Sequence, residues 1–351
     1  MVNAPDRSMR ARRAARPDKV PDNAGSNEAA PAGYTWTALV DHLVTAHGSL
    51  ARVAELLSES RGFRDDVASV ERALRRLRTR GDQPGGVWGA RLLERFGLPE
   101  EPAQRARWMG SYHSRFTDLP VEACESLLRM WDSGPVRESR SRVWIELGLT
   151  SVALRRRALE LADRHLARAK LLLARSHPAA AVEWALTDGF VGSRLEAQGR
   201  VDAALALAGE ALEKHAHEID PDELACLRAR WIDQRAFDLN RTRSPENERL
   251  ALALYESLAD KGAPAFARCR RENGLAYGHL RRGDLAVARA HAERAARAAG
   301  DAGALRLRAM SLLMIVKIAG VANALEELER ARAIARSLGD HELLARVERA
   351  R

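Results

Sequence analysis

The chain has 351 residues with a formal net charge of +9, and aromatic residues make up only 5% of it. Ala, Leu, Arg and Glu dominate, a mixture that favours helix and disfavours strand. The length suits two domains or one elongated helical array, and the excess of arginine is compatible with an anionic partner.

The cysteines and the apolar segments exclude several classes of protein. Cys124, Cys226 and Cys269 are odd in number, widely spaced and form no CxxC motif, so they predict buried thiols and neither a disulfide framework nor a zinc site. No apolar run reaches the roughly 18 residues of a membrane span, and no apolar segment near the start marks secretion. We therefore expect a soluble cytoplasmic protein with no membrane contact.

Residues 1–33 are polar and rich in Pro and Ala, without helical or strand periodicity. They contain the basic cluster "RSMRARRAARPDK", and this composition predicts a disordered basic arm. Such an arm can lie along phosphates or simply keep the chain in solution, and the sequence leaves both interpretations open.

Residues 34–99 predict four short helices joined by tight turns. Thr35, Ser49 and Ser69 have the residue types and positions of N-caps for the first three helices, and glycines follow the first, third and fourth. Four helices of this length form a compact head of the size of a DNA-binding domain.

Within this head, "GSLARVAELL" resembles the scaffold helix of the factor-for-inversion type of bacterial helix-turn-helix, with Ala54 where the two helices touch. The linker "SESRGFRDDVA" is longer than the usual tight turn, so the angle between the helices stays open. The next helix would carry the DNA contacts, because arginine offers a rigid donor fork to guanine edges and phosphates. The second interpretation is an arginine-rich face that only meets water. The expected DNA-binding residues are Arg72, Arg75, Arg76, Arg78 and Arg80.

Residues 100–135 hold most of the aromatic character, including Trp108, Tyr112, Phe116 and Trp131. Aromatic residues at helical spacing are typically buried, so this connecting segment is expected to pack the head onto the following helices. An effector pocket or a surface for stacking bases is the second interpretation.

A repeat follows from residue 136 onward. A glycine at a turn is followed five residues later by a small residue and seven residues after that by another, as in Gly283, Ala288 and Ala295. Small residues at these places let two antiparallel helices approach closely. The repeats recur every 36–47 residues, which suits a solenoid of helical hairpins. The other instances are Gly199 with Ala204 and Ala211, and more loosely Ala162/Ala169, Ala251/Leu258 and Ala324/Ala331.

Residues 136–351 resemble a tetratricopeptide-repeat (TPR) array, best matched by Leu275, Gly283-Asp284, Ala288 and Ala295. The resemblance implies that the first helix of each pair lines a concave surface that binds a peptide or protein. These helices are expected at residues 179–198, 222–240, 263–282 and 303–319. Their arginines would favour an acidic or C-terminal carboxylate ligand, and ordinary solvated positions are the second interpretation. The expected effector-binding residues are Arg230, Asp233, Gln234, Arg270, Asn273 and Arg306.

No catalytic signature is present in the sequence. "DGFVGSRLEAQGR" is rich in glycine but lacks the phosphate-loop pattern, and there is no GxSxG motif. His215 and His217 are two residues apart and do not share a helix face, so they make a poor metal site. We expect no enzyme, no cofactor and no metal.

These patterns together predict an all-α protein, with a small helix-turn-helix-like head followed by a TPR-like helical-hairpin solenoid. This organisation resembles bacterial regulators that join a DNA-binding head to a repeat array. The resemblance implies transcription regulation by a homodimer, in which an effector changes how two heads are spaced on DNA. Two further interpretations stay open, a protein-interaction scaffold without nucleic-acid binding and an RNA-binding adaptor.

Overall fold

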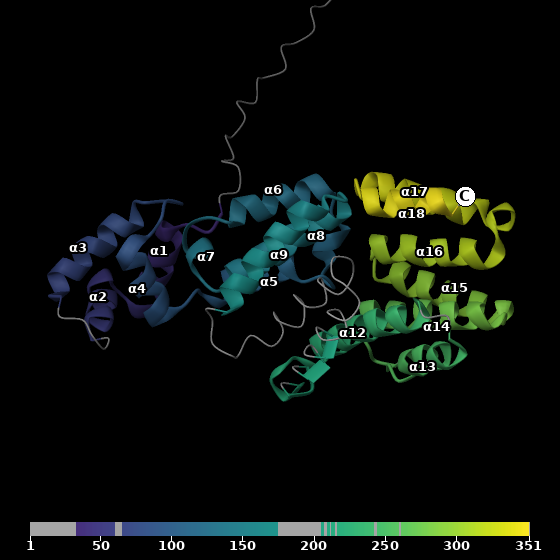
Figure 1. The fold of residues 1–351 in the computed structure, drawn as a ribbon. Helices are drawn as coiled ribbons and strands as arrows, with labels where there is room; N and C mark the ends of the chain where they lie inside the picture. The colour runs from purple at the N-terminus through teal and green to yellow at the C-terminus, as the bar shows by residue number, and fades with distance from the viewer. Residues whose placement is uncertain are drawn as a thin grey trace, which may run out of the picture. The chain divides into compact units, whose positions relative to one another are not determined.

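The computed structural model describes residues 33–59, 65–174, 205–206, 209–210, 212–214, 216–241, 244–259 and 261–350. Every regular element among these residues is a helix, so the expected all-α class is confirmed (Figure 1). In the part of the chain that is described, no helix combines the length and the hydropathy needed to cross a bilayer. The expected basic arm lies outside the described residues apart from Gly33, and the expected domain boundaries stay a prediction.

The helices of the N-terminal half end at residue 174. They are α1 (Trp36–His47), α2 (Leu50–Ser58), α3 (Val67–Arg78), α4 (Gly86–Phe96), α5 (Glu100–Gly110), the 3₁₀-helix η1 (Arg115–Asp118), α6 (Val121–Trp131), α7 (Gly134–Glu138), α8 (Arg142–Arg155) and α9 (Leu159–Ala174).

The remaining helices with defined bounds lie between residues 216 and 349. They are η2 (Ala216–Glu218), α12 (Pro221–Arg241), α13 (Pro245–Glu256), α14 (Ala265–Arg282), α15 (Leu285–Asp301), α16 (Leu305–Ala319), η3 (Val321–Asn323), α17 (Leu325–Ser337) and α18 (His341–Arg349).

Side-chain caps fix where the first helices begin. The Thr35 and Ser49 hydroxyls accept backbone N–H groups at the starts of α1 and α2, which confirms both predicted caps. The expected Ser69 cap of α3 is wrong. Asp66 is the N-cap, because its carboxylate accepts the N–H groups of Ala68 and Ser69 and the helix starts earlier.

The head, α1–α4, packs around Trp36, which is fully buried with Leu39, Leu74 and Leu92. The Trp36 indole N–H donates to the Gln83 carbonyl oxygen at 2.8 Å. A Cβ atom on Gly85 or Gly89 would come within 3 Å of the indole ring, so these two glycines let α4 lie against it.

A second core forms between α5, α6, α8 and α9. Met109 and Phe116 belong to this core rather than to that of the head, whereas Trp108 stays 37% exposed. Tyr34 packs against both cores. The aromatic segment is therefore anchored on α8 and α9, which fixes the loop that follows α5.

From α12 to α18, helices next to each other in the chain pack side by side (Figure 1). In addition α12 contacts α14, α14 contacts α16 and α16 contacts α18, an arrangement compatible with a helical repeat. Ala288 and Ala295 are fully buried on α15, and Gly283 ends α14 with a φ of +83°. The helices expected at residues 222–240, 263–282 and 303–319 are confirmed as α12, α14 and α16, while residues 179–198, Gly199, Ala204 and Ala211 lie outside the described residues.

Candidate functional site

Three arginines from three helices surround one tyrosine. Arg230, Arg270 and Arg306 lie on α12, α14 and α16, 40 and 36 residues apart, so the spacing of the helical hairpins brings them together. Tyr112 reaches them from the loop between α5 and η1. Its hydroxyl oxygen accepts from Arg270 Nη2 at 3.2 Å and from Arg306 Nη1 at 3.1 Å. The Arg230 guanidinium lies 3.9 Å from the centre of the tyrosine ring.

Two carboxylates hold Arg270 and Arg306 in place. Asp233 accepts from Arg270 Nη1 at 2.6 Å and from the Tyr255 hydroxyl at 2.8 Å. Asp340 is fully buried and accepts from Arg306 Nε at 2.9 Å and from Arg155 Nε at 3.1 Å. Each carboxylate therefore joins two elements of the cluster.

The arginines change the acidity of Tyr112. Burial alone would raise the pKa of its hydroxyl, but the positive charges of Arg306, Arg270 and Arg230 lower that pKa to about 6. Burial also lowers the pKa of Arg230 to about 10. An ionised Tyr112 would thus be a negative charge held among guanidinium groups at neutral pH.

A large cavity of about 1140 Å³ opens beside this cluster, lined by residues of α8, α12, α14, α16 and α18. Nine of its described lining residues are Arg or Lys and two are Asp or Glu. All six residues expected to bind an effector line this one cavity, namely Arg230, Asp233, Gln234, Arg270, Asn273 and Arg306. The positive charge that the sequence spreads over several helices is concentrated here.

Arg270 Nε and Asn273 Oδ1 are buried polar atoms of the cavity wall that have no hydrogen-bond partner among the described residues, and Arg270 is only 8% exposed. The Asn273 side chain is held by its own amide group, because Nδ2 donates to the Ser311 hydroxyl at 2.9 Å. Buried polar groups are usually hydrogen-bonded, so an unsatisfied donor and acceptor in one cavity favour a bound polar ligand.

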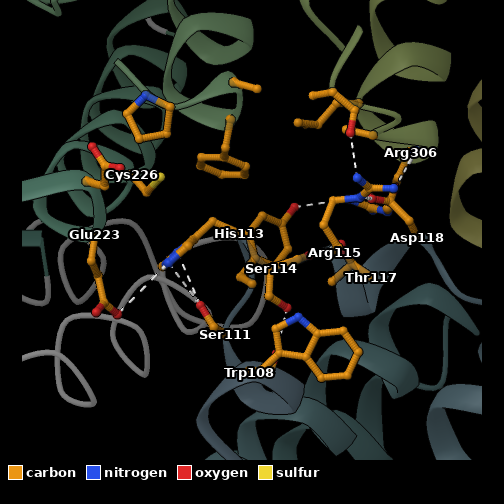
Figure 2. Close-up of a pocket in the computed structure, with 18 of the residues that line it drawn as sticks. Trp108, Ser111, His113, Ser114, Arg115, Thr117, Asp118, Glu223, Cys226 and Arg306 are labelled. Atoms are coloured by element: carbon orange, nitrogen blue, oxygen red, sulfur yellow. Dashed lines mark hydrogen bonds and ion pairs between the residues drawn. The ribbon is translucent and has the colours of Figure 1, made fainter. Parts of the chain in front are cut away.

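A smaller cavity of about 470 Å³ shares Tyr112, Arg270 and Arg306 with the large one. Figure 2 shows His113 between Ser111 and Glu223, with Arg306 and Asp118 on the other side. Pro264, Phe266 and Leu307 also line this cavity, so it adds an apolar chamber on the other side of the cluster.

Ser111, His113 and Glu223 do not form a catalytic relay. The Ser111 hydroxyl lies 3.0 Å from His113 Nε2 and 3.3 Å from Nδ1, so it faces the ring edge between the two nitrogens. Its shorter contact is to Nε2, the nitrogen that also lies 3.9 Å from the Glu223 carboxylate. A serine–histidine–acid triad needs the acid and the serine on opposite nitrogens of the ring. Burial, with Arg230 and Arg107 nearby, also lowers the pKa of His113 to about 4, so His113 is a weak base.

The arginines expected to contact DNA are all exposed at the surface of the head. Several of them have partners there, since Arg75 pairs with Glu71 at 2.5 Å and Arg78 pairs with Asp41 at 2.7 Å. Arg72 donates to the Ser69 hydroxyl, and Arg80 donates to the Pro84 carbonyl oxygen. The Asp41 contact comes from α1 and was not foreseen, so this face carries more acid than the sequence of α3 alone indicates.

Sequence reasoning missed several members of the Tyr112 cluster, among them Tyr112 itself and Asp340. Tyr112 stood in the aromatic segment, but nothing in the sequence connected it to arginines more than a hundred residues away. No pattern in the sequence indicated a role for Asp340. Comparisons with known protein families, curated proteins and solved structures find no match to this chain.

Proposed function

We propose that this chain is a DNA-binding transcriptional regulator whose TPR-like array binds an acidic peptide or protein effector. The observation that carries the proposal is the large cavity, where nine cationic and two acidic residues meet. A cavity lined by charges of one sign raises the local concentration of ligands of the other sign. The proposal includes no catalysis, and its further parts are a cytoplasmic protein and a homodimer with two heads on one DNA site.

The size and chemistry of the large cavity favour an extended peptide over a small metabolite. Its volume of about 1140 Å³ exceeds the roughly 300–1000 Å³ of typical small-molecule pockets. Arginine binds carboxylates through two parallel hydrogen bonds, which suits acidic side chains and a C-terminal carboxylate. Asn273 Oδ1 is a buried acceptor that can take a peptide N–H group.

The head supplies the second part of the proposal. Arg72 and Arg76 lie on the exposed side of α3, opposite the buried Val70, Leu74 and Leu77. A helix that enters the major groove displays such side chains outward. The exposed ion pairs of this helix are weak, so phosphates can replace their carboxylate partners.

Peptide binding is tested by charge reversal at the cavity. A labelled, glutamate-rich peptide with a free C-terminus is titrated against the full chain, with its glutamine counterpart as the control ligand. R241E/R349E reverses two exposed cations of the cavity wall, and R289E/R308E reverses two exposed cations elsewhere. We expect the first variant to bind at least about tenfold more weakly and the second to bind as the wild type does. Equal affinities of all three proteins would refute the peptide assignment.

DNA binding is tested by mobility shift with duplex DNA and duplex RNA over a range of salt concentrations. R75E/R76E on α3 should abolish DNA binding, whereas R330E/R336E on α17 should preserve it, because both pairs are exposed and carry the same change of charge. Neutralising one arginine that contacts a phosphate should lower the salt slope by about one. Binding to duplex RNA alone would favour the adaptor, and binding to neither duplex would favour the scaffold.

A further inference from the structure

We propose that Arg230, Arg270 and Arg306 form an anion subsite, which takes one carboxylate or phosphate group of the ligand in competition with the Tyr112 hydroxyl. The proposal deepens the proposed function, since it rests on an acidic ligand in the large cavity. It assigns Tyr112 as a built-in occupant of the subsite.

The geometry of Tyr112 is that of a bound oxyanion. Its oxygen accepts from Arg270 at 3.2 Å and from Arg306 at 3.1 Å, so two guanidinium groups from different helices converge on one atom. Arg230 adds its charge over the ring face. A carboxylate or phosphate oxygen at this place would receive the same two hydrogen bonds.

The balance of charge around Tyr112 also supports an anion subsite. Five cations face it from five helices, against three carboxylates. The cations are Arg155 of α8, Arg230 of α12, Arg270 of α14, Arg306 of α16 and Arg346 of α18, and the acids are Asp233, Asp340 and Glu342. On the side of the small cavity, Arg107 pairs with Glu223 and Arg115 with Asp118, and Asp222 adds one further acid, so the cations still outnumber the acids by one when both sides are counted.

A surplus of buried positive charge is costly unless an anion accompanies it. Ionised Tyr112 supplies one such anion, and the pKa of its hydroxyl, lowered to about 6 by the arginines against the opposing effect of burial, allows it to ionise at neutral pH. Arg270 Nε still lacks an acceptor among the described residues and is covered from solvent, so an acceptor reaches it only when a neighbouring side chain moves. Displacement of the Tyr112 side chain would let a ligand oxygen reach Arg270 Nε.

Two anions on the same guanidinium groups repel each other, so ligand binding and Tyr112 ionisation exclude each other. Below about pH 6 the hydroxyl is neutral and competes weakly with the ligand. Above this pH the ionised hydroxyl competes, and affinity for an anion that does not titrate should fall about tenfold per pH unit. At pH 8 the affinity for such an anion should therefore be about 100-fold lower than at pH 5.

The test uses the full chain and sodium sulfate, with sodium chloride at equal ionic strength as the control. Ionised tyrosine has its own near-ultraviolet band, and burial raises the pKa of Tyr34 to about 12 and also raises that of Tyr255, so neither contributes near neutral pH. The Y112F variant identifies the Tyr112 part of the band. At ten times its dissociation constant, sulfate should raise the midpoint of the wild-type titration by about one pH unit, and chloride should not.

Y112F, with its helix content checked by circular dichroism, should bind sulfate about 100-fold more tightly than the wild type at pH 8 and equally at pH 5. Sulfate binding by the wild type that is independent of pH from 5 to 8 would overturn the proposal, and this result does not depend on the variant. A glutamate-rich peptide that binds without changing the tyrosinate band would overturn the subsite but leave the proposed function. A normal sulfate response without peptide binding would support the subsite and refute the peptide.

Discussion

Asp340 connects the start of α18 to α8 and α16, so its replacement should lower the stability of the fold by a predictable amount. One carboxylate oxygen caps α18 by accepting the Leu343 N–H at 2.9 Å, and the other accepts from Arg155 and Arg306. The side chain of Asp340 is fully buried, and those of Arg155 and Arg306 are 3% and 12% exposed. D340A therefore removes a helix cap and leaves two buried cations without their shared carboxylate.

The magnitude follows from these two losses. Breaking a buried ion pair from one side costs roughly 3–5 kcal/mol, and loss of an N-cap costs roughly 0.5–2 kcal/mol. Because one residue makes both interactions, we expect a total of about 4 kcal/mol. For a unit of this size each kcal/mol lowers Tm by roughly 2–4 °C, so D340A should melt about 10 °C below the wild type. D340N keeps a capping oxygen but loses the charge, so its Tm should lie between those of D340A and the wild type.

Thermal unfolding followed by circular dichroism measures the effect, with D284A as the matched control. Asp284 is the N-cap residue of α15, but its side chain makes no cap hydrogen bond and is 43% exposed. Its removal should change stability by no more than about 0.5 kcal/mol. Equal shifts of Tm in D340A and D284A would refute the reasoning.

The pH dependence gives a second check on Asp340. Burial would raise the pKa of its carboxyl, but Arg306, the Leu343 N–H and Arg155 hold that pKa below its usual range. A depressed folded-state pKa contributes stability that is present above the unfolded value of about 3.9 and is lost as the pH falls through the folded value. The difference in Tm between wild type and D340N should therefore narrow below about pH 4.

Two further predictions concern packing. A288L should lower the free energy of unfolding in urea by roughly 1–3 kcal/mol, because Ala288 is fully buried on α15. R282A, at the exposed end of α14, should leave that free energy nearly unchanged. Equal losses in the two variants would mean that the hairpin register is wrong. G110A should lower Tm by several degrees, because its Cβ would lie 2.2 Å from the Trp144 carbonyl oxygen. The Cβ of G300A would meet the Arg308 side chain at 3.7 Å, an ordinary van der Waals distance, so this variant should leave Tm unchanged or raise it slightly. A tolerated G110A would show that α5 and α8 are not in close contact.

Local signals in the sequence predicted the helices well. Thr35, Ser49 and the glycine after α14 were recognisable because a cap acts through its immediate neighbours. The same rule failed at Ser69, since Asp66 stands three residues earlier and its carboxylate accepts the N–H groups of Ala68 and Ser69, so Ser69 already lies inside the helix. Where two candidate caps lie that close together, the sequence does not decide between them.

The cavity wall was predictable for a different reason. The hairpin period places Arg230, Arg270 and Arg306 on the first helices of successive pairs, and this could be inferred from the small-residue spacing. The position of Tyr112 could not, because its contact with Arg306 joins residues 194 apart in the chain and depends on the path of the loop after α5. Asp340 depends likewise on where α18 lies against α8 and α16.

The unfavourable free energy of burying three arginines together indicates that the cluster serves ligand binding rather than the stability of the fold. A repeat that only had to stack its hairpins would be at least as stable with apolar side chains at these three positions, since buried ion pairs often stabilise less than apolar packing of the same volume. Instead, Arg230, Arg270 and Arg306 bring three like charges together, and Asp233, Asp340 and Tyr112 are needed to offset them. Tyr112 can lose its charge near neutral pH, and it comes from outside the hairpins. An anion that replaced it would restore the balance of charge and free the loop after α5, which connects the cavity to the core of α5, α6, α8 and α9.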